Sequence, residues 1–355
     1  MAVALLLLLA RFQDDRDTDP TPLPGDAEKH YRLARFDEAE GDLRKQMATA
    51  PSDTLRAGLL QVLVRARKHE ELSRESDAVL SGTRDDATRA LALWAKGRAQ
   101  WRLGDGEGAR GSLESALKLA DAKGPNAYPS VRRSVAQERA LMGWKRTETK
   151  HFELWTPPDT PLDIDARARA LEAAYDRITG VMGAGPSSKI EAWFFNDQRQ
   201  ADVALGVPLN FAAPRDAAFY VLADSPGAHE LAHVVGFSAA AARGKGRPTC
   251  ALLIEGLAVA LSGEPLWEKR MVDVPAKLSR ERRLKRLADL AALAGGDSEF
   301  SAIAGSIVKR LLDGHGREAF TKLWMEFHDS ADPWKAALGV TLDELDAAWR
   351  KGVGE

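Results

Sequence analysis

The spacing of apolar residues changes near residue 150, and this change restricts the folds that the chain can adopt. From Ala27 to about Gly143, apolar residues recur at helical intervals between short turns, and strand-like alternation is absent. The segment His151–Trp155 alternates and ends at Pro157-Pro158, as a strand does. A chain of 355 residues is also long for one hydrophobic core. We therefore expect an all-α N-terminal domain followed by a domain that contains a sheet.

The residues after 150 predict an α+β domain with a small sheet. Asp163–Met182 carries its apolar residues on one face, which indicates an amphipathic helix. Ile190–Phe195 and Ala217–Leu222 have the pattern of further strands. A helix is expected to begin directly after Gly227, and the pattern is helical again from Glu255 to the end. This order of elements favours a small mixed sheet covered by helices.

Two stretches of the N-terminal domain are similar to each other. Ala39 and Ala109 are seventy residues apart, twice a period of thirty-five, and a weaker copy lies between them at Glu71-Leu72. Gly104-Asp105 marks the turn before one copy. Small residues at such positions lie where paired helices touch, so the segment resembles a degenerate tetratricopeptide array. An unrelated helical bundle is the alternative.

Composition and charge describe an ordinary globular protein. The chain is 45% hydrophobic and 29% charged, and its net charge of −2 gives no general attraction for nucleic acid or an anionic membrane. We interpret the basic run from Arg280 to Arg286 as a solvated helix face. The single cysteine, Cys250, excludes an internal disulfide framework and a cysteine-rich zinc site. Because an apolar run follows Cys250, we expect it to be buried as a small hydrophobic residue.

The N-terminus carries a short apolar run. Ala2–Ala10 is too short to span a bilayer but suits the hydrophobic region of a signal peptide, which predicts an exported, periplasmic or extracellular protein. A hydrophobic strand or tail of a cytoplasmic protein is the alternative. Asp17–Gly25 is rich in proline and is expected to be a linker. We assign residues 1–26 to these segments, and expect no transmembrane span elsewhere.

The string His229-Glu230-Leu231-Ala232-His233 has the form H-E-x-x-H within a segment expected to be helical. Residues four apart lie one above the other on a helix, so both imidazoles can reach one metal ion. The glutamate beside the first histidine then points to the same site, where it can take a proton from a water activated by the metal. The motif predicts a zinc site; two structural histidines are the alternative.

A catalytic zinc ion usually has three protein ligands and an open fourth position, so a third ligand is required. In one class of zinc peptidase a glycine lies three residues after the second histidine, and a third histidine follows three residues later. Gly236 fits that class, but Ala239 occupies the histidine position. Glu255 is the better candidate, because a lone carboxylate within the apolar run Leu252–Ala258 would be costly without a partner. A helix-end charge or an ion pair is the alternative for Glu255.

The H-E-L-A-H string, followed by Glu255-Gly-Leu-Ala258, resembles the gluzincin metallopeptidases, in particular the peptidase MA-like family. His151-Phe-Glu-Leu is similar to the strand that opens these domains. Ser301–Val308 with Leu311–Gly316 is similar to their helix and glycine turn after the metal site. Thr341-Leu-Asp-Glu-Leu, with Trp349, is similar to their closing helix. The resemblance covers about residues 150 to 355.

The resemblance implies a helical-repeat domain at residues 27–148 and a zincin-like domain at residues 149–355. It also implies a Zn²⁺ cofactor held by His229, His233 and Glu255, with Glu230 as the general base. Such a protein would be a zinc metallopeptidase whose substrate is a peptide or protein.

The chain departs from this family in the surroundings of the metal site. Some gluzincins have an acidic residue four positions after the ligand glutamate, which orients a zinc histidine, but Val259 stands there. The outer nitrogens of the histidines must then find another acceptor, such as a main-chain carbonyl or Asp224. Tyr220 and His315 are the candidates for stabilising the oxyanion or donating a proton. A core aromatic residue and a helix C-terminal charge are their respective alternatives.

Three functions remain open at this point. The first is peptide hydrolysis, with an extended substrate adding its backbone to the sheet edge at Ala217–Leu222. The second is a peptide-binding or assembly module, in which the helical repeats bind a protein partner and the zincin-like domain is a scaffold. Hydrolysis of a non-peptide amide would use the same site. The intact Glu230 favours an enzyme, because a purely structural site has no use for a base beside its ligands.

Overall fold

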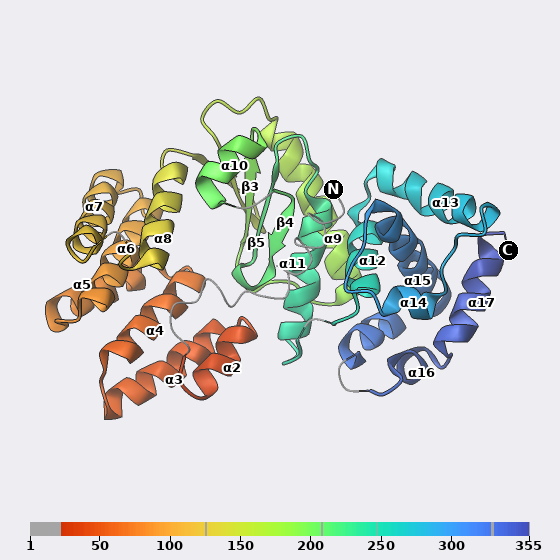
Figure 1. Ribbon diagram of the computed structural model, residues 1–355, viewed down its shortest axis with the longest axis horizontal. Helices are drawn as coiled ribbons and strands as arrows, with labels where there is room; N and C mark the ends of the chain where they lie inside the picture. Colours follow the sequence, from red (N-terminus) through yellow and green to blue (C-terminus); the bar gives the residue numbers. More distant parts are fainter. Residues whose placement is uncertain (1–22, 125, 207–208, 247, 328–329, 355) are drawn as a thin grey trace. The chain divides into compact units, whose positions relative to one another are not determined.

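The structure, a computed structural model, describes residues 23–354 except 125, 207, 208, 247, 328 and 329. The run Ala2–Ala10 and most of the expected linker lie outside the described residues. The described chain forms two compact units, one of residues 23–145 and 197–206 and the other of residues 146–196 and 209–354. Figure 1 shows both units coloured along the sequence.

The regular secondary structure of the first unit is helical, except that its residue Lys145 begins strand β1 (Lys145–Glu148). Its helices are α2 (Asp26–Arg32), α3 (Phe36–Thr49), α4 (Asp53–Arg65), α5 (His69–Gly82), α6 (Asp86–Arg102), α7 (Gly106–Ala122), α8 (Pro129–Leu141) and α10 (Gln198–Leu205). Each of α3 to α8 contacts the helix before it, and α4 and α8 also contact α6. Helix α10 comes from a later part of the sequence and packs against α8.

Three turns of this unit have the same structure, and they make the internal repeat visible. Helices α3, α5 and α7 each follow a residue in the left-handed conformation: Ala34 (φ 55°), Arg67 (φ 57°) and Gly104 (φ 90°). Only the third is a glycine, the residue that adopts this conformation without a side-chain penalty, so a search for glycines finds one turn of three. The residue five positions after each of these is fully buried: Ala39, Leu72 and Ala109. The unit therefore contains three equivalent helix-turn-helix pairs.

The second unit contains the small mixed sheet that the sequence predicts. Its strands are β1 (Lys145–Glu148), β2 (Phe152–Thr156), β3 (Ile190–Phe195), β4 (Phe211–Ala213) and β5 (Ala218–Leu222), in the order β1-β2-β3-β5-β4. The strands β2, β3 and β5 are parallel, and β4 is antiparallel to β5. The α+β prediction is confirmed at this level, and the three predicted strands are present within a residue of their expected bounds.

The prediction that Ala217–Leu222 forms a sheet edge is wrong. Strand β5 lies between β3 and β4, so both of its sides are paired, and β4 forms this edge of the sheet. The sequence analysis missed β4 because three residues, Phe211–Ala213, are too few to show an alternating pattern.

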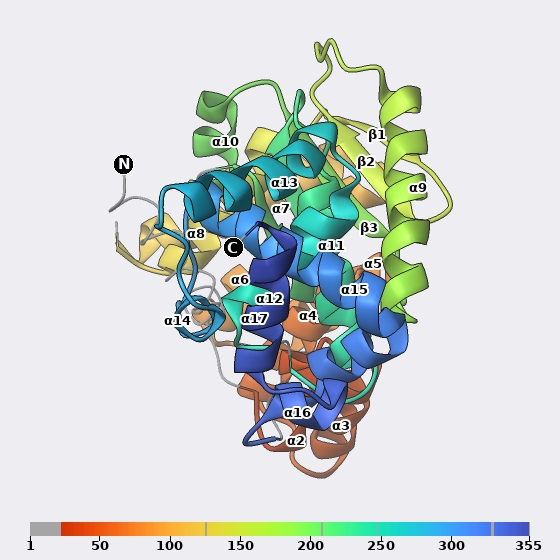
Figure 2. The ribbon, with the colours of Figure 1, turned by 90° about the vertical axis from the view of Figure 1, so that its right-hand side faces the viewer.

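Helices make up most of the second unit. They are α9 (Ile164–Met182), α11 (Ala228–Ala241), α12 (Ala251–Ser262), α13 (Pro265–Arg280), α14 (Leu287–Ala291), α15 (Ser298–Glu326), α16 (Pro333–Leu338) and α17 (Leu342–Gly352). Figure 2 shows α9 alongside the strands, with α12 and α15 close together. Within the described residues, no helix combines the length and the apolar composition needed to cross a membrane.

The structure shows where Cys250 and the basic run from Arg280 to Arg286 lie. Cys250 is buried, as expected. The basic run is not a helix face: Arg280 is the last residue of α13, and Arg282 to Arg286 follow in an exposed turn and loop. The left-handed conformation of Arg282 (φ 56°) ends the helix there.

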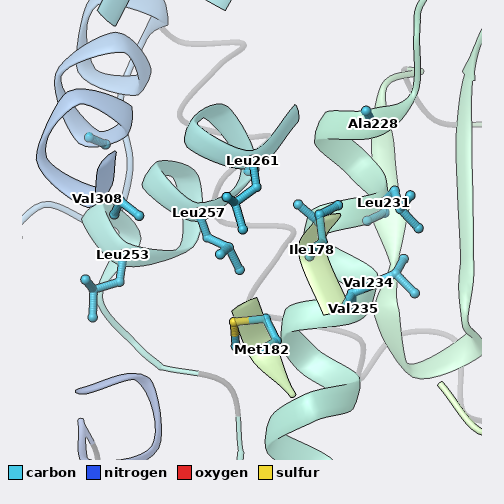
Figure 3. Packing of buried hydrophobic residues seen from close by; sticks show 14 of the residues in the cluster. Ile178, Met182, Ala228, Leu231, Val234, Val235, Leu253, Leu257, Leu261 and Val308 are labelled. Carbon is cyan, nitrogen blue, oxygen red and sulfur yellow. The ribbon is translucent and has the colours of Figure 1, made fainter. Parts of the chain in front are cut away.

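One hydrophobic core joins the sheet to the helices of the second unit. Phe219 and Val221 of β5 belong to the same buried cluster as Leu231 of α11. Figure 3 shows Leu257 and Leu261 of α12 directed towards α9. Because side chains alternate along a strand, Tyr220 faces the opposite side of the sheet from Phe219.

Candidate metal centre

The H-E-x-x-H motif lies in the first two turns of α11, as the sequence predicts. The helix begins after Gly227, whose φ of 80° and whose contact with Phe219, 3.0 Å from an added Cβ, both favour glycine. His229 and His233 lie one turn apart on one face, and their Nε2 atoms are 3.2 Å apart. The other faces of the helix carry Leu231 and its apolar neighbours into the core.

Glu255, on α12, completes a group of three. Its Oε2 atom lies 3.5 Å from Nε2 of His229, and its Oε1 atom lies 3.7 Å from Nε2 of His233. The donor atoms of these three residues all lie within 4.8 Å of one another, and they form a possible metal-binding group. The side chains are only 19%, 8% and 18% exposed for His229, His233 and Glu255, so the group is largely buried but still reachable from one side. The structure thus brings together the three residues proposed as ligands.

Glycines allow the helices that carry these ligands to approach closely. A Cβ added to Gly256, the residue after Glu255, would lie 2.6 Å from the carbonyl oxygen of Ala304 on α15. One added to Gly236 of α11 would lie 2.9 Å from both Leu257 and Trp324. Gly236 therefore has a packing role. Neither contact is local in sequence, so the sequence analysis did not find them.

The close approach of α12 and α15 gives Glu255 a hydrogen-bond partner that sequence reasoning missed. The buried hydroxyl of Ser301 on α15 donates to the Glu255 carboxylate. Val259, four residues after Glu255, is buried against Gly305 of α15 and only fills space. The orienting contacts at this site therefore come from other helices.

Burial and neighbouring charges shift the pKa values of three residues at the centre. Burial would raise the pKa of Glu255, but the hydrogen bond from His229 and the charges of both histidines outweigh it and hold the pKa at about 2. Burial would lower the pKa of His229, but Glu255 and Glu230 outweigh it and raise the pKa to about 9. Burial raises the pKa of Glu230 to about 7. The group thus stabilises positive charge between its carboxylates.

The Glu230 carboxylate has a free oxygen beside the group. Its side chain is buried, and its Oε2 atom has no hydrogen-bond partner. A buried carboxylate oxygen without a donor is costly unless something polar occupies the space beside it. Glu230 is therefore placed to accept a hydrogen bond from a water molecule or a substrate.

Residues of α13 and α9 surround the first histidine. The ring of Trp267 lies 6.1 Å from that of His229, nearly parallel to it. One turn before Trp267, the carboxylate of Glu264 accepts a hydrogen bond from the main-chain amide of His229. Arg167 of α9 is close enough to attract the Glu264 carboxylate. These contacts join helices that are far apart in the sequence, so no local pattern predicts them.

The expected acceptor for the outer nitrogen of His229 is not present. Its Nδ1 atom is buried and has no hydrogen-bond partner. Asp224, the suggested acceptor, is exposed and interacts with Arg167. The proposal of Asp224 as the orienting residue is therefore not supported.

Neither candidate for oxyanion stabilisation is brought to this group. Tyr220 lies on the other face of the sheet, where its ring stacks with Phe211 at 4.8 Å and with Trp193 at 6.3 Å. His315 is exposed and lies on α15 fourteen residues after Ser301, which at about 1.5 Å per residue is roughly 20 Å along the helix. The glycine turn expected after it is a kink at Gly316 within α15.

Comparisons with protein-family models, curated proteins and solved structures found no match for this chain.

Proposed function

We propose that the protein is a zinc metallopeptidase of the gluzincin type, with His229, His233 and Glu255 holding the zinc ion. The spacing of the donor atoms carries this proposal. Two ligands bound tetrahedrally to zinc at about 2.0–2.1 Å are roughly 3.3–3.4 Å apart. The separations here are 3.2, 3.5 and 3.7 Å, so one ion fits the group with small side-chain adjustments.

The electrostatics also fit a cation. Glu255, Glu230 and Glu264 lie near the imidazole of His229, and its pKa is raised because these carboxylates stabilise positive charge. Two neutral histidines and one carboxylate are a common ligand set for catalytic zinc, and they leave a fourth position open. Purely structural sites usually have four protein ligands.

When bound, zinc acts as a Lewis acid and makes water a better nucleophile near neutral pH. Glu230 accepts a proton from the attacking water, and its unpartnered oxygen is available for this hydrogen bond. It then delivers the proton to the departing amine nitrogen.

The substrate in this proposal is an extended peptide beside β4. This strand forms the edge of the sheet next to β5, and it contacts the helix that carries the two histidines. An exposed strand edge binds extended peptides through main-chain hydrogen bonds. The contact between β4 and α11 supports this placement.

The test combines metal analysis with cleavage of a mixed peptide library. Wild-type protein should bind one zinc ion and cleave peptides, and a chelator should abolish the cleavage until zinc is returned. Glu230→Gln should retain zinc and lose roughly 10²–10⁴-fold in kcat. Glu318→Gln, at an exposed position of α15, is the matched control and should cleave normally. Full activity in Glu230→Gln would refute the role of the base.

The helical unit supports a second proposal, that α2–α8 bind a protein. Repeated helix pairs stack into extended surfaces that bind peptides and proteins. In the enzyme this surface would recruit substrate. Protein that binds neither zinc nor a substitute metal, and cleaves nothing, would favour an assembly module with an inactive second unit.

A further inference from the structure

One polar atom at the centre is left without a partner although it belongs to a proposed ligand. When Nε2 of a neutral histidine binds a metal, Nδ1 carries the proton and needs an acceptor. Nδ1 of His229 is buried and has no hydrogen-bond partner among the described residues. An unpaired buried donor costs about 1–3 kcal/mol, and an unoriented ligand weakens metal binding.

The position that supplies the acceptor in some gluzincins is not available here. Val259 is 1% exposed, and its side chain packs against Gly305, where an added Cβ would lie 2.3 Å from it. A carboxylate at this position would be buried between α12 and α15. The acceptor must therefore come from another element.

Glu264 is the carboxylate already in contact with His229. It precedes the first turn of α13, and its side chain makes no capping hydrogen bond to its own helix. Instead, the carboxylate accepts the main-chain amide of His229, in the first turn of α11. A carboxylate has two oxygens, so the second oxygen is available for the imidazole of the same residue.

The surroundings hold Glu264 in this place. Its main-chain amide donates to the hydroxyl of Ser262 at 3.3 Å, and its carbonyl accepts from the amide of Trp267 at 2.9 Å. The Trp267 ring lies beside the imidazole of His229 and restricts its rotation. The positive charge of Arg167 attracts the carboxylate.

We propose that Glu264 is the positioning residue of the metal centre. In the structure Nδ1 of His229 makes no hydrogen bond, and Glu264 contacts the main-chain amide of the same residue. In the metal-bound state the second carboxylate oxygen of Glu264 would turn to accept the Nδ1 hydrogen and fix the tautomer in which Nε2 faces the metal. This inference rests on the proposed zinc site. It assigns to the start of α13 the orienting role that Val259 cannot perform. The competing explanation is that Glu264 only caps the N-terminus of α11.

Zinc affinity of the full chain, measured by competition with a chelator of known affinity, distinguishes these explanations. Glu264→Gln should bind zinc about 10-fold more weakly than wild type because an amide oxygen accepts less well, and Glu264→Ala about 100-fold more weakly. Glu268→Gln, one turn further along α13 and exposed, is the matched control and should bind as wild type does. With cobalt(II) bound in place of zinc, the visible spectrum of both Glu264 variants should differ from that of wild type, and the spectrum of Glu268→Gln should not.

The outcomes separate the inference from the proposed function. Wild-type zinc affinity in both Glu264 variants, with a lowered melting temperature of the metal-free protein, would show that Glu264 is only a helix cap. That result would overturn the inference and leave the zinc site in place. Wild-type protein that binds no zinc would overturn the zinc site and the inference together.

Discussion

The contact between α12 and α15 at Gly256 gives the sharpest test of how this fold positions its metal site. A Cβ added there would lie 2.4 Å from Cγ2 of Val308 and 2.6 Å from the carbonyl oxygen of Ala304. The valine can adjust, but the carbonyl belongs to a helix backbone and cannot move alone. Gly256→Ala must therefore push the two helices apart.

The expected magnitude follows from two opposing effects. Overpacking a core typically costs about 1–3 kcal/mol, and the backbone contact places this case near 3 kcal/mol. Alanine in place of glycine within a helix recovers about 1 kcal/mol. We therefore expect Gly256→Ala to lower the free energy of unfolding by about 2 kcal/mol, which corresponds to roughly 4–8 °C in melting temperature for a unit of this size.

Gly180→Ala is the matched control because Gly180 lies within α9 and an added Cβ meets nothing within 4 Å. It should raise the stability by about 1 kcal/mol. Calorimetry of the metal-free protein measures both variants. Gly256→Ala should also weaken zinc binding, since Glu255 is the adjacent residue. A Gly256→Ala protein as stable as Gly180→Ala would refute the close packing of α12 on α15.

Two further predictions concern hydrogen bonds to carboxylates. Ser301→Ala should weaken zinc binding by about 10-fold because it removes the hydrogen-bond donor to Glu255. Ser306→Ala is the control, because it loses only a contact to Trp349 and should bind zinc as wild type does. Equal zinc affinities for the two variants would contradict this prediction. The pKa of Glu172 is lowered because hydrogen bonds from Thr149 and His151 outweigh the effect of burial. A lowered folded-state pKa means that this stabilisation, about 1 kcal/mol, is present above the unfolded pKa and is lost as the pH falls through the folded pKa. The advantage of wild type over Glu172→Gln in stability should therefore be larger at pH 6 than at pH 3, and a pH-independent difference in urea denaturation would contradict this sign.

The parts of the fold that were predictable depend on local patterns. The amphipathic pattern of residues 163–182 became α9, and the alternation and apolar composition of Ile190–Phe195 became β3 with the same bounds. The repeat was only partly visible, since two of the three left-handed turns use Ala34 and Arg67 where a glycine would have been recognised. The short edge strand β4 carried too few residues to be found, and it changed which strand forms the sheet edge.

The same division applies to the candidate site. His229, Glu230 and His233 follow from helix geometry alone, because residues four apart must lie on the same face. Glu255 was inferred from the cost of a charge in an apolar run, and the structure places its oxygens 3.5 and 3.7 Å from the imidazoles. For Tyr220 the sequence left two possibilities open, an oxyanion role and a core aromatic residue, because the alternation of a strand fixes relative faces but not which face meets the metal-binding helix.

The sequence by itself indicated a helical first part, a later sheet and the placing of His229 and His233 on one helix face, because these follow from periodicities of two and of about four residues. Glu255 was inferred from the cost of a charge in an apolar run. The tertiary structure alone decided which groups orient those ligands. Ser301 and Glu264 reach the site only because α15 and α13 pack against α12 and α11, and small residues such as Gly256 permit the approach. Such contacts depend on distances between helices far apart in the chain, and no local pattern of residues encodes them.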